Sequence, residues 1–243
     1  MVRPVMAKVR LYVEHALGAA QPVPLTREQA HYLFGVMRLG QGDRVALFNG
    51  ADGEWQAEVA EAGKKGGILV CAEQSAPQAL PPDLWLMFAP VKKARTDFIV
   101  EKAVEMGARR ILPVTTDHTN SERIRQDRLQ AHAIEAAEQC GGTFVPEVAE
   151  MARLADVLAR WPDNRQLMFC DEAAGGGGLA GAARGPWAIL IGPEGGFSQS
   201  ERARLTAMPQ AITVSLGPRI LRAETAALAA VTMALAAAGK FGA

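Results

Sequence analysis

Residues 188–207 have the sequence AILIGPEGGFSQSERARLTA, and this stretch decides the fold. It opens with an apolar run, 188–191, of the kind that forms a strand covered on both faces. A glycine-rich loop follows, and Ser198 with Glu201 then has the S-x-x-E spacing of a helix capping box. The stretch therefore predicts a strand, a tight loop and a helix over 199–207. The capping box favours a structural role for its two residues over a catalytic one.

The same alternation continues on both sides of this stretch. Apolar runs predict further strands over 84–89, 111–114, 167–171 and 212–216. Helical periodicity and end signals predict helices over 94–106, 127–140, 154–161 and 223–238. Five strands that alternate with helices are typical of an α/β domain with a mainly parallel sheet. We expect this domain to occupy residues 84–243.

The first part of the chain has a different, β-rich pattern. Short runs bounded by Gly, Asn and Asp predict strands over 9–13, 43–48, 54–61 and 67–73. One helix is expected over 26–39, with Thr26 as its N-cap and Gly40 just past its end. Together these elements indicate a small barrel-like module over 1–74. Three prolines and no periodicity make 75–83 the expected linker.

Composition excludes several classes of protein. The chain carries 26 basic and 26 acidic residues, so its net charge of zero offers no support for nucleic-acid binding. The longest apolar runs are too short to span a bilayer, and no signal peptide is apparent. The three cysteines, Cys71, Cys140 and Cys170, are widely spaced and have no nearby His partners. We therefore expect a cytoplasmic protein with no metal, no disulfide framework and no membrane partner.

Two strand ends share an unusual pattern. Both Ile191 and Leu216 are followed directly by Gly-Pro, and each loop then leads into a helix. Glycine lets the backbone approach a ligand closely, and proline fixes the direction of the chain. Because ligands of open α/β sheets bind outside the carboxyl ends of the strands, two such loops indicate one shared site.

The ligand expected at these loops has no phosphate groups. The chain contains no P-loop sequence. Gly176, Gly178 and Gly181 match G-x-G-x-x-G, but they lie in a glycine run and Gly185-Pro186 follows, so the required long helix cannot form. A ligand held by backbone groups suits the two loops better.

These loops resemble the paired signatures of the SPOUT methyltransferases, and in particular of the RsmE-type 16S ribosomal RNA uridine-N3 methyltransferases. The likeness covers nearly the whole chain. Its most specific part is the eleven-residue segment 216–226, LGPRILRAETA. Further matching segments are Arg10 to Val13, His31 to Leu33, Val36 to Leu39, Gly42 to Val45, Phe48 to Gly50, Lys92-Lys93, Glu101 to Gly107 and Glu138 to Gly141.

The resemblance implies a PUA-like N-terminal RNA-binding domain and a SPOUT-type domain with a trefoil knot. It also implies a homodimer that uses S-adenosyl-L-methionine to methylate N3 of a uridine in 16S rRNA of the 30S subunit, uridine 1498 in the usual rRNA numbering. Backbone atoms are expected to hold the cofactor at Ile191, Gly192, Gly195, Gly196, Leu216, Gly217, Ile220 and Leu221. Arg222 is the first catalytic candidate, as a cation that stabilises the anionic base, and Glu224 is a weaker candidate for proton acceptor, with helix capping as its alternative role.

RNA phosphates would be neutralised by basic residues of both domains. The candidates are Arg10, Arg38, Arg44, Lys92, Lys93 and Arg95. One departure from the family pattern is Gly142, where the family often has Arg. Two other classes remain open, namely an RNA-binding protein built on a decayed methyltransferase domain and a nucleotide-dependent oxidoreductase. An active methyltransferase should bind S-adenosylmethionine, whereas a decayed domain should not. Co-purification of a nicotinamide cofactor would indicate the oxidoreductase.

Overall fold

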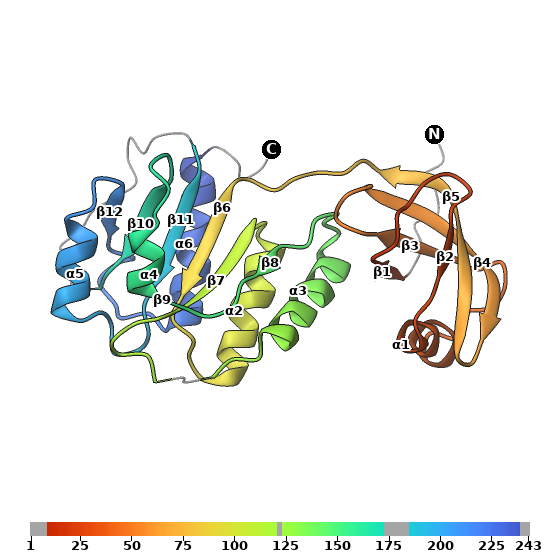
Figure 1. Ribbon diagram of the computed structural model, residues 1–243, viewed down its shortest axis with the longest axis horizontal. Helices are drawn as coiled ribbons and strands as arrows, with labels where there is room; N and C mark the ends of the chain where they lie inside the picture. Colours follow the sequence, from red (N-terminus) through yellow and green to blue (C-terminus); the bar gives the residue numbers. More distant parts are fainter. Residues whose placement is uncertain (1–8, 121–122, 173–184, 239–243) are drawn as a thin grey trace. The chain divides into compact units, whose positions relative to one another are not determined.

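The computed structural model describes residues 9–120, 123–172 and 185–238. The chain forms two compact units (Figure 1). Unit 1 contains residues 1–80 and 137–145, and unit 2 contains 81–136 and 146–243. The sequence predicted a division near 75–83, but the return of the chain to unit 1 at 137–145 was not anticipated.

Unit 1 is built on a mixed sheet with strand order β1-β3-β4-β5-β2. Its strands are β1 (Arg10–Tyr12), β2 (Pro22–Pro24), β3 (Arg44–Phe48), β4 (Glu54–Gly63) and β5 (Gly66–Ala76). β1 pairs with β3 in parallel, and the other neighbours are antiparallel. The four predicted strands are confirmed. β2 was missed because prolines flank Val23, and it lies at the sheet edge, where missing N–H donors are tolerated.

The predicted helix over 26–39 is shorter and less regular than expected. A four-residue helix, α1 (Arg27–Ala30), continues as a π-helical turn, η1 (His31–Val36). Thr26 is the N-cap, as predicted, and forms a capping box with Gln29. The segment ends before Gly40, because Arg38 adopts a φ of +58°, a left-handed conformation that is rare for a side chain of this size.

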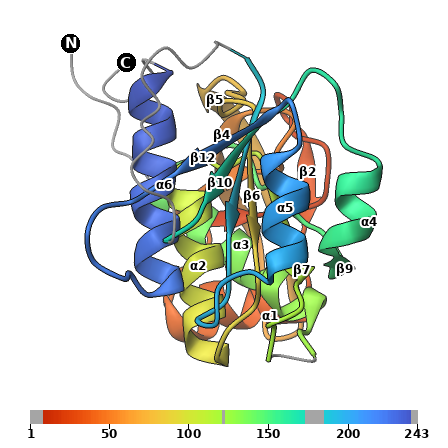
Figure 2. The same ribbon diagram turned by 90° about the vertical axis from the view of Figure 1, so that its left-hand side faces the viewer.

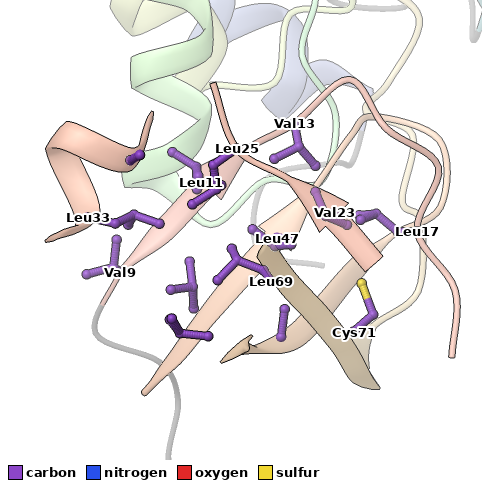
Figure 3. Packing of buried hydrophobic residues seen from close by; sticks show 14 residues of the cluster. Val9, Leu11, Val13, Leu17, Val23, Leu25, Leu33, Leu47, Leu69 and Cys71 are labelled. Carbon is purple, nitrogen blue, oxygen red and sulfur yellow. The ribbon is translucent and has the colours of Figure 1, made fainter. Parts of the chain in front are cut away.

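The core of unit 1 is apolar (Figure 3). Val23, Leu47 and Leu69 are fully buried, and Cys71 packs among them as a small apolar group. A loop carboxylate, Asp52, accepts hydrogen bonds from the Leu17 backbone N–H at 2.9 Å and from the Asn49 side chain at 2.7 Å. These two bonds lower the pKa of Asp52, with the backbone bond as the larger cause.

Unit 2 is an α/β domain with a parallel sheet, as predicted. Its strands are β6 (Leu84–Phe88), β7 (Arg110–Thr115), β8 (Glu147–Val148), β9 (Ala152–Arg153), β10 (Gln166–Cys170), β11 (Trp187–Ile191) and β12 (Ala211–Val214). The order is β12-β10-β11-β6-β7-β8, and β9 also pairs with β7. β8 and β9 were not predicted, because each is only two residues long.

Helices cover both faces of this sheet. They are α2 (Lys93–Glu105), α3 (Gln126–Cys140), α4 (Leu154–Ala159), α5 (Gln199–Thr206) and α6 (Ala223–Ala237). Figure 2 shows α2 and α6 on one side of the sheet and α4 and α5 on the other. Ile99 and Ala103 of α2 are buried, whereas Phe98 is 38% exposed. In the described part of the chain, no helix has the length and apolar character needed to cross a membrane.

Candidate functional site

A cavity of about 180 Å³ lies at the carboxyl ends of β10, β11 and β12. The two Gly-Pro loops both line this cavity, an arrangement that the prediction of one shared site requires. The lining includes Ile191, Gly192, Gly196, Leu216, Gly217, Ile220, Leu221 and Arg222 from the predicted residues. Strand order explains the meeting: β10 lies between β11 and β12, and the loops after these outer two strands close over its end.

Gly192 allows the first loop to fold over its own strand. A Cβ atom at this position would lie 2.7 Å from Cε2 of Phe197. The Phe197 ring is only 3% exposed and packs edge-on against Phe169, with ring centroids 5.0 Å apart. The aromatic pair therefore anchors the loop to the core of unit 2, and glycine leaves the space that this packing requires.

Two further glycines provide the backbone conformations of the loops. Gly196 has a φ of +64° and Gly217 a φ of +117°, both in the region that favours glycine. The predicted capping box is confirmed: the Ser198 hydroxyl accepts from the Glu201 N–H, and the Glu201 side chain accepts from the Ser198 N–H. This box fixes the start of α5 directly after the loop.

Gly195 has a different environment from its neighbour Gly196. It is absent from the cavity lining, and its carbonyl oxygen lies 2.9 Å from Nδ1 of His118. The structure thus brings seven of the eight predicted cofactor positions to the cavity and places Gly195 against His118.

The end of β10 contributes side chains that the sequence analysis missed. Cys170, Asp171 and Glu172 all line the cavity. Asp171 binds Arg202 through both carboxylate oxygens, at 3.0 and 3.1 Å. Burial raises the pKa of Cys170 to about 12, so its thiol stays neutral and is a weak nucleophile at pH 7. The predicted strand over 167–171 could have indicated these residues, because ligands bind outside the carboxyl ends of parallel strands.

Arg222 and Glu224 lie at the start of α6 in different settings. Arg222 is the N-cap residue and lines the cavity, and it makes no ion pair within the described residues. Glu224 does not line the cavity; its Oε1 lies 3.5 Å from Nε of Arg95. Arg95 also donates to Glu194 of the first loop at 3.0 Å. It therefore links α2 to the first Gly-Pro loop and to the start of α6.

The predicted phosphate-binding residues also differ in availability. Arg10 is occupied within unit 1, because it pairs with Glu54 at 2.7 Å and donates to the carbonyl oxygens of Ala137, Glu138 and Gly142. Arg44 forms an exposed ion pair with the Glu73 carboxylate. The remaining candidates are Arg38, which follows η1, Lys92 and Lys93 at the start of α2, and Arg95 in its ion pairs.

The chemistry of the cavity is mixed. Apolar side chains form part of its wall, and Ile220 is 81% exposed at the second loop. Carboxylates come from Asp171, Glu172 and Glu194, and cations from Arg219 and Arg222. Within the described ranges, no group of three His, Cys, Asp or Glu side chains is placed to hold a metal. The G-x-G-x-x-G match at residues 176–181 falls outside the described residues.

Family models match both parts of the chain. Residues 78–235 match the RNA methyltransferase domain, and residues 25–70 match the RNA methyltransferase PUA domain. The ribosomal RNA small subunit methyltransferase E of Rickettsia conorii is 28% identical over 91% of this chain and 93% of its own length. The protein of the same name from a Synechocystis strain is 30% identical over 84% of this chain and 69% of its own.

A solved structure has the same fold over nearly the whole chain. The ribosomal RNA small subunit methyltransferase E of Neisseria gonorrhoeae, crystallised with S-adenosyl methionine, has a TM-score of 0.86 and 26% identity. The match covers 94% of this chain and 97% of that one. The chain therefore belongs to the RNA methyltransferase family that includes the ribosomal RNA small subunit methyltransferase E proteins, as the sequence resemblance implied.

Proposed function

We propose that this protein transfers a methyl group from S-adenosylmethionine to N3 of a uridine in 16S rRNA, uridine 1498 in the usual numbering. The observation that carries the proposal is the single cavity formed by the two Gly-Pro loops. Its support is twofold. The relatives bear the name of small-subunit rRNA methyltransferases, and the Neisseria protein of the same fold holds S-adenosyl methionine.

The cavity suits this cofactor chemically. Adenine is flat and largely apolar, and Ile191, Leu216 and Leu221 supply apolar wall. The amino group and the sulfonium are cationic, and Glu172 and Glu194 supply carboxylates within the same lining. Gly192 and Gly196 line the cavity and contribute only backbone atoms to its wall. When bound, S-adenosylmethionine supplies an electrophilic methyl group that needs no metal activation.

Arg222 has the position of an electrostatic catalyst. Uracil N3 carries a proton and is a poor nucleophile until that proton leaves, at which point negative charge spreads onto the ring oxygens. A guanidinium held at the cavity wall stabilises this charge as it develops. Arg222 suits the task because no ion pair with another described residue consumes its charge.

Glu224 is better supported as a residue that positions the start of α6. It occupies the first helical turn, where a carboxylate interacts favourably with the helix dipole, and it pairs with Arg95. Its Oε2 atom is buried and has no hydrogen-bond partner within the described residues. The proton-acceptor role proposed for it from the sequence requires that oxygen to face the substrate, and Glu224→Gln tests this role through the pH profile of turnover.

The remaining parts of the proposal concern partners and topology. The PUA-type unit is proposed to bind rRNA of the 30S subunit, since its family model is that of RNA methyltransferases. The homodimer, the trefoil knot and the cytoplasmic location stay predictions from the resemblance. Light scattering coupled to gel filtration tests the dimer directly.

Calorimetry with S-adenosylmethionine and a methylation assay on 30S subunits test the function. We expect Arg222→Ala to lower turnover by about 10²-fold or more, the usual loss of an electrostatic group, while cofactor affinity changes by less than about 3-fold. Arg160→Ala, an exposed residue at the end of α4, is the control. Mass-spectrometric mapping identifies the methylated base.

The outcomes separate the candidate classes. Absence of cofactor binding in the wild type would indicate a decayed domain. Methylation of another base or position would overturn the uridine-N3 assignment. Full turnover of Arg222→Ala would remove that residue from the mechanism.

A further inference from the structure

A second cavity, of about 270 Å³, opens at the starts of α2 and α3 in unit 2. We call it the basic pocket. Its lining consists of Val91, Lys93, Thr96, Arg123, Ile124, Arg125, Arg128 and Leu129. Four of these eight residues are cations and none is acidic, although the whole chain has zero net charge. This local excess of positive charge distinguishes the pocket from the cofactor cavity, which contains carboxylates.

Ion pairs neutralise only part of this charge. Arg128 is held by Asp97 through both carboxylate oxygens, in a partly buried bidentate pair. Arg125 pairs with Asp127, but both side chains are largely exposed, so the pair is weak. Lys93 and Arg123 are exposed and make no ion pair with any residue that the structure describes.

The start of α2 adds to the positive potential. Lys92 is the N-cap residue and makes no side-chain capping bond, and the first turn contains no acidic residue. Cations at the positive end of a helix dipole are unfavourable unless an anion compensates them. The Thr96 hydroxyl in the lining is already engaged, because it accepts from the N–H of Val91 and donates to its carbonyl oxygen.

We propose that the basic pocket binds a phosphate group of the RNA substrate, with Lys93 and Arg123 as its principal ligands. Guanidinium and ammonium groups are the side chains that bind phosphate oxygens, and the ion pair with Asp97 fixes Arg128 in place to assist. The inference rests on the proposed function for the source of the phosphate. It goes beyond the sequence analysis, which did not assign Arg123, Arg125 or Arg128 to RNA.

The first turn of α2 lines the basic pocket and contacts one residue of the cofactor cavity. Lys93 lines the basic pocket, and two residues later Arg95 donates to Glu194 in the lining of the cofactor cavity. An RNA strand whose phosphate occupies the basic pocket is therefore held by the same helical turn that contacts the wall of the cofactor cavity. Phosphate contacts of this kind set the register of the strand and carry no base specificity.

The test is the salt dependence of RNA affinity for the double variant K93Q/R123Q. Fluorescence anisotropy with a 16S rRNA fragment that contains the target uridine gives the affinity at several salt concentrations. Each phosphate contact to a single strand contributes about 0.7 to the magnitude of the slope of log K against log salt. Loss of two contacts should therefore reduce that magnitude by about 1.4. Affinity at low salt should fall by about 10-fold or more, while calorimetric affinity for S-adenosylmethionine stays unchanged.

Two controls keep the result specific. Arg160→Gln removes one exposed charge elsewhere in unit 2 and should leave the slope unchanged. The pair K93R/R123K retains both charges and should restore most of the affinity. Circular dichroism and thermal melting verify that each variant is folded.

An unchanged slope and affinity in K93Q/R123Q would overturn the proposal while leaving the methyltransferase function intact. Failure of the wild type to bind either cofactor or RNA would instead contradict the proposed function. Titration with inorganic phosphate distinguishes the source: if K93Q/R123Q loses phosphate binding but keeps full RNA affinity, the pocket takes free phosphate and the RNA assignment is wrong.

Discussion

Replacement of Gly192 by Ala should destabilise the loop of the cofactor cavity through one steric contact. The added Cβ would lie 2.7 Å from Cε2 and 3.1 Å from Cζ of Phe197. Carbon atoms normally pack at about 3.5–4.0 Å, so the ring must move by roughly 1 Å. It cannot move freely, because it is buried against Phe169 within the core of unit 2.

Overpacking of this kind costs about 1–3 kcal/mol of unfolding free energy. For a protein of this size, each kcal/mol lowers the melting temperature by about 2–4 °C. We therefore expect Gly192→Ala to lower the melting temperature by about 2–12 °C. Because Gly192 and Phe197 both line the cavity, the affinity for S-adenosylmethionine should fall as well.

The double variant Gly192→Ala/Phe197→Leu isolates the cause, since leucine lacks the ring edge that the new Cβ meets. Differential scanning calorimetry of the wild type, both single variants and the double variant gives the coupling free energy. We expect a compensating coupling of at least about 1 kcal/mol, as for residues in direct contact. Simple additivity, or a Gly192→Ala variant as stable as the wild type, would refute the steric argument.

Three further predictions address other groups. Arg95→Gln should reduce methyl transfer more than cofactor affinity, because it releases Glu224 and the first loop together. Steady-state kinetics measure the first effect and calorimetry the second, and equal losses would contradict a positioning role for Arg95. Asp52→Asn should remove a stabilisation that the wild type has at neutral pH. Since folding lowers the Asp52 pKa, that contribution is present above its ordinary value of 3.8 and is lost as the pH falls below it, so the two proteins should converge in urea titrations at low pH. Iodoacetamide at pH 8 should label exposed Cys140 well before Cys170, whose pKa is raised to about 12. Peptide mass spectrometry measures both rates, and equal labelling would contradict the raised pKa of Cys170.

Most of the fold could be predicted from the sequence because its signals are local. The apolar strands, the capping box at Ser198 and the N-cap at Thr26 each depend on a few neighbouring residues. The two-residue strands β8 and β9 could not be found, since so short a segment has no measurable periodicity. The irregular end of the predicted helix over 26–39 depends on Arg38, whose backbone conformation no local pattern indicated.

The candidate site was only partly predictable because no local sequence pattern determines the order of the strands in the sheet. β10 precedes β11 in the chain but lies between β11 and β12 in the sheet. That order brings Asp171 and Glu172 into the cavity, and neither residue belongs to a recognisable motif. Similarly, adjacent Gly195 and Gly196 are equivalent in sequence, and only their positions in space distinguish them.

Arg10 illustrates a limit of the same kind. A basic residue near the chain start suggested contact with RNA, but its guanidinium binds carbonyl oxygens more than 120 residues away along the chain. Burial of that group depends on the return of residues 137–145 to unit 1. No pattern within the first 80 residues reveals it.

That return also governs the order of events during synthesis. The first 80 residues leave the ribosome without the carbonyl oxygens that later receive the Arg10 guanidinium, and Glu138, which bonds the Tyr12 backbone N–H, is also missing. The amino-terminal unit is therefore complete only after about two fifths of the polypeptide beyond residue 80 has been translated. A fragment cut at residue 80 would keep the Arg10–Glu54 ion pair but lose the three carbonyl acceptors of Arg10 and the acceptor of the Tyr12 N–H, so an excised version of this unit needs the 137–145 segment supplied to it, covalently or as a peptide.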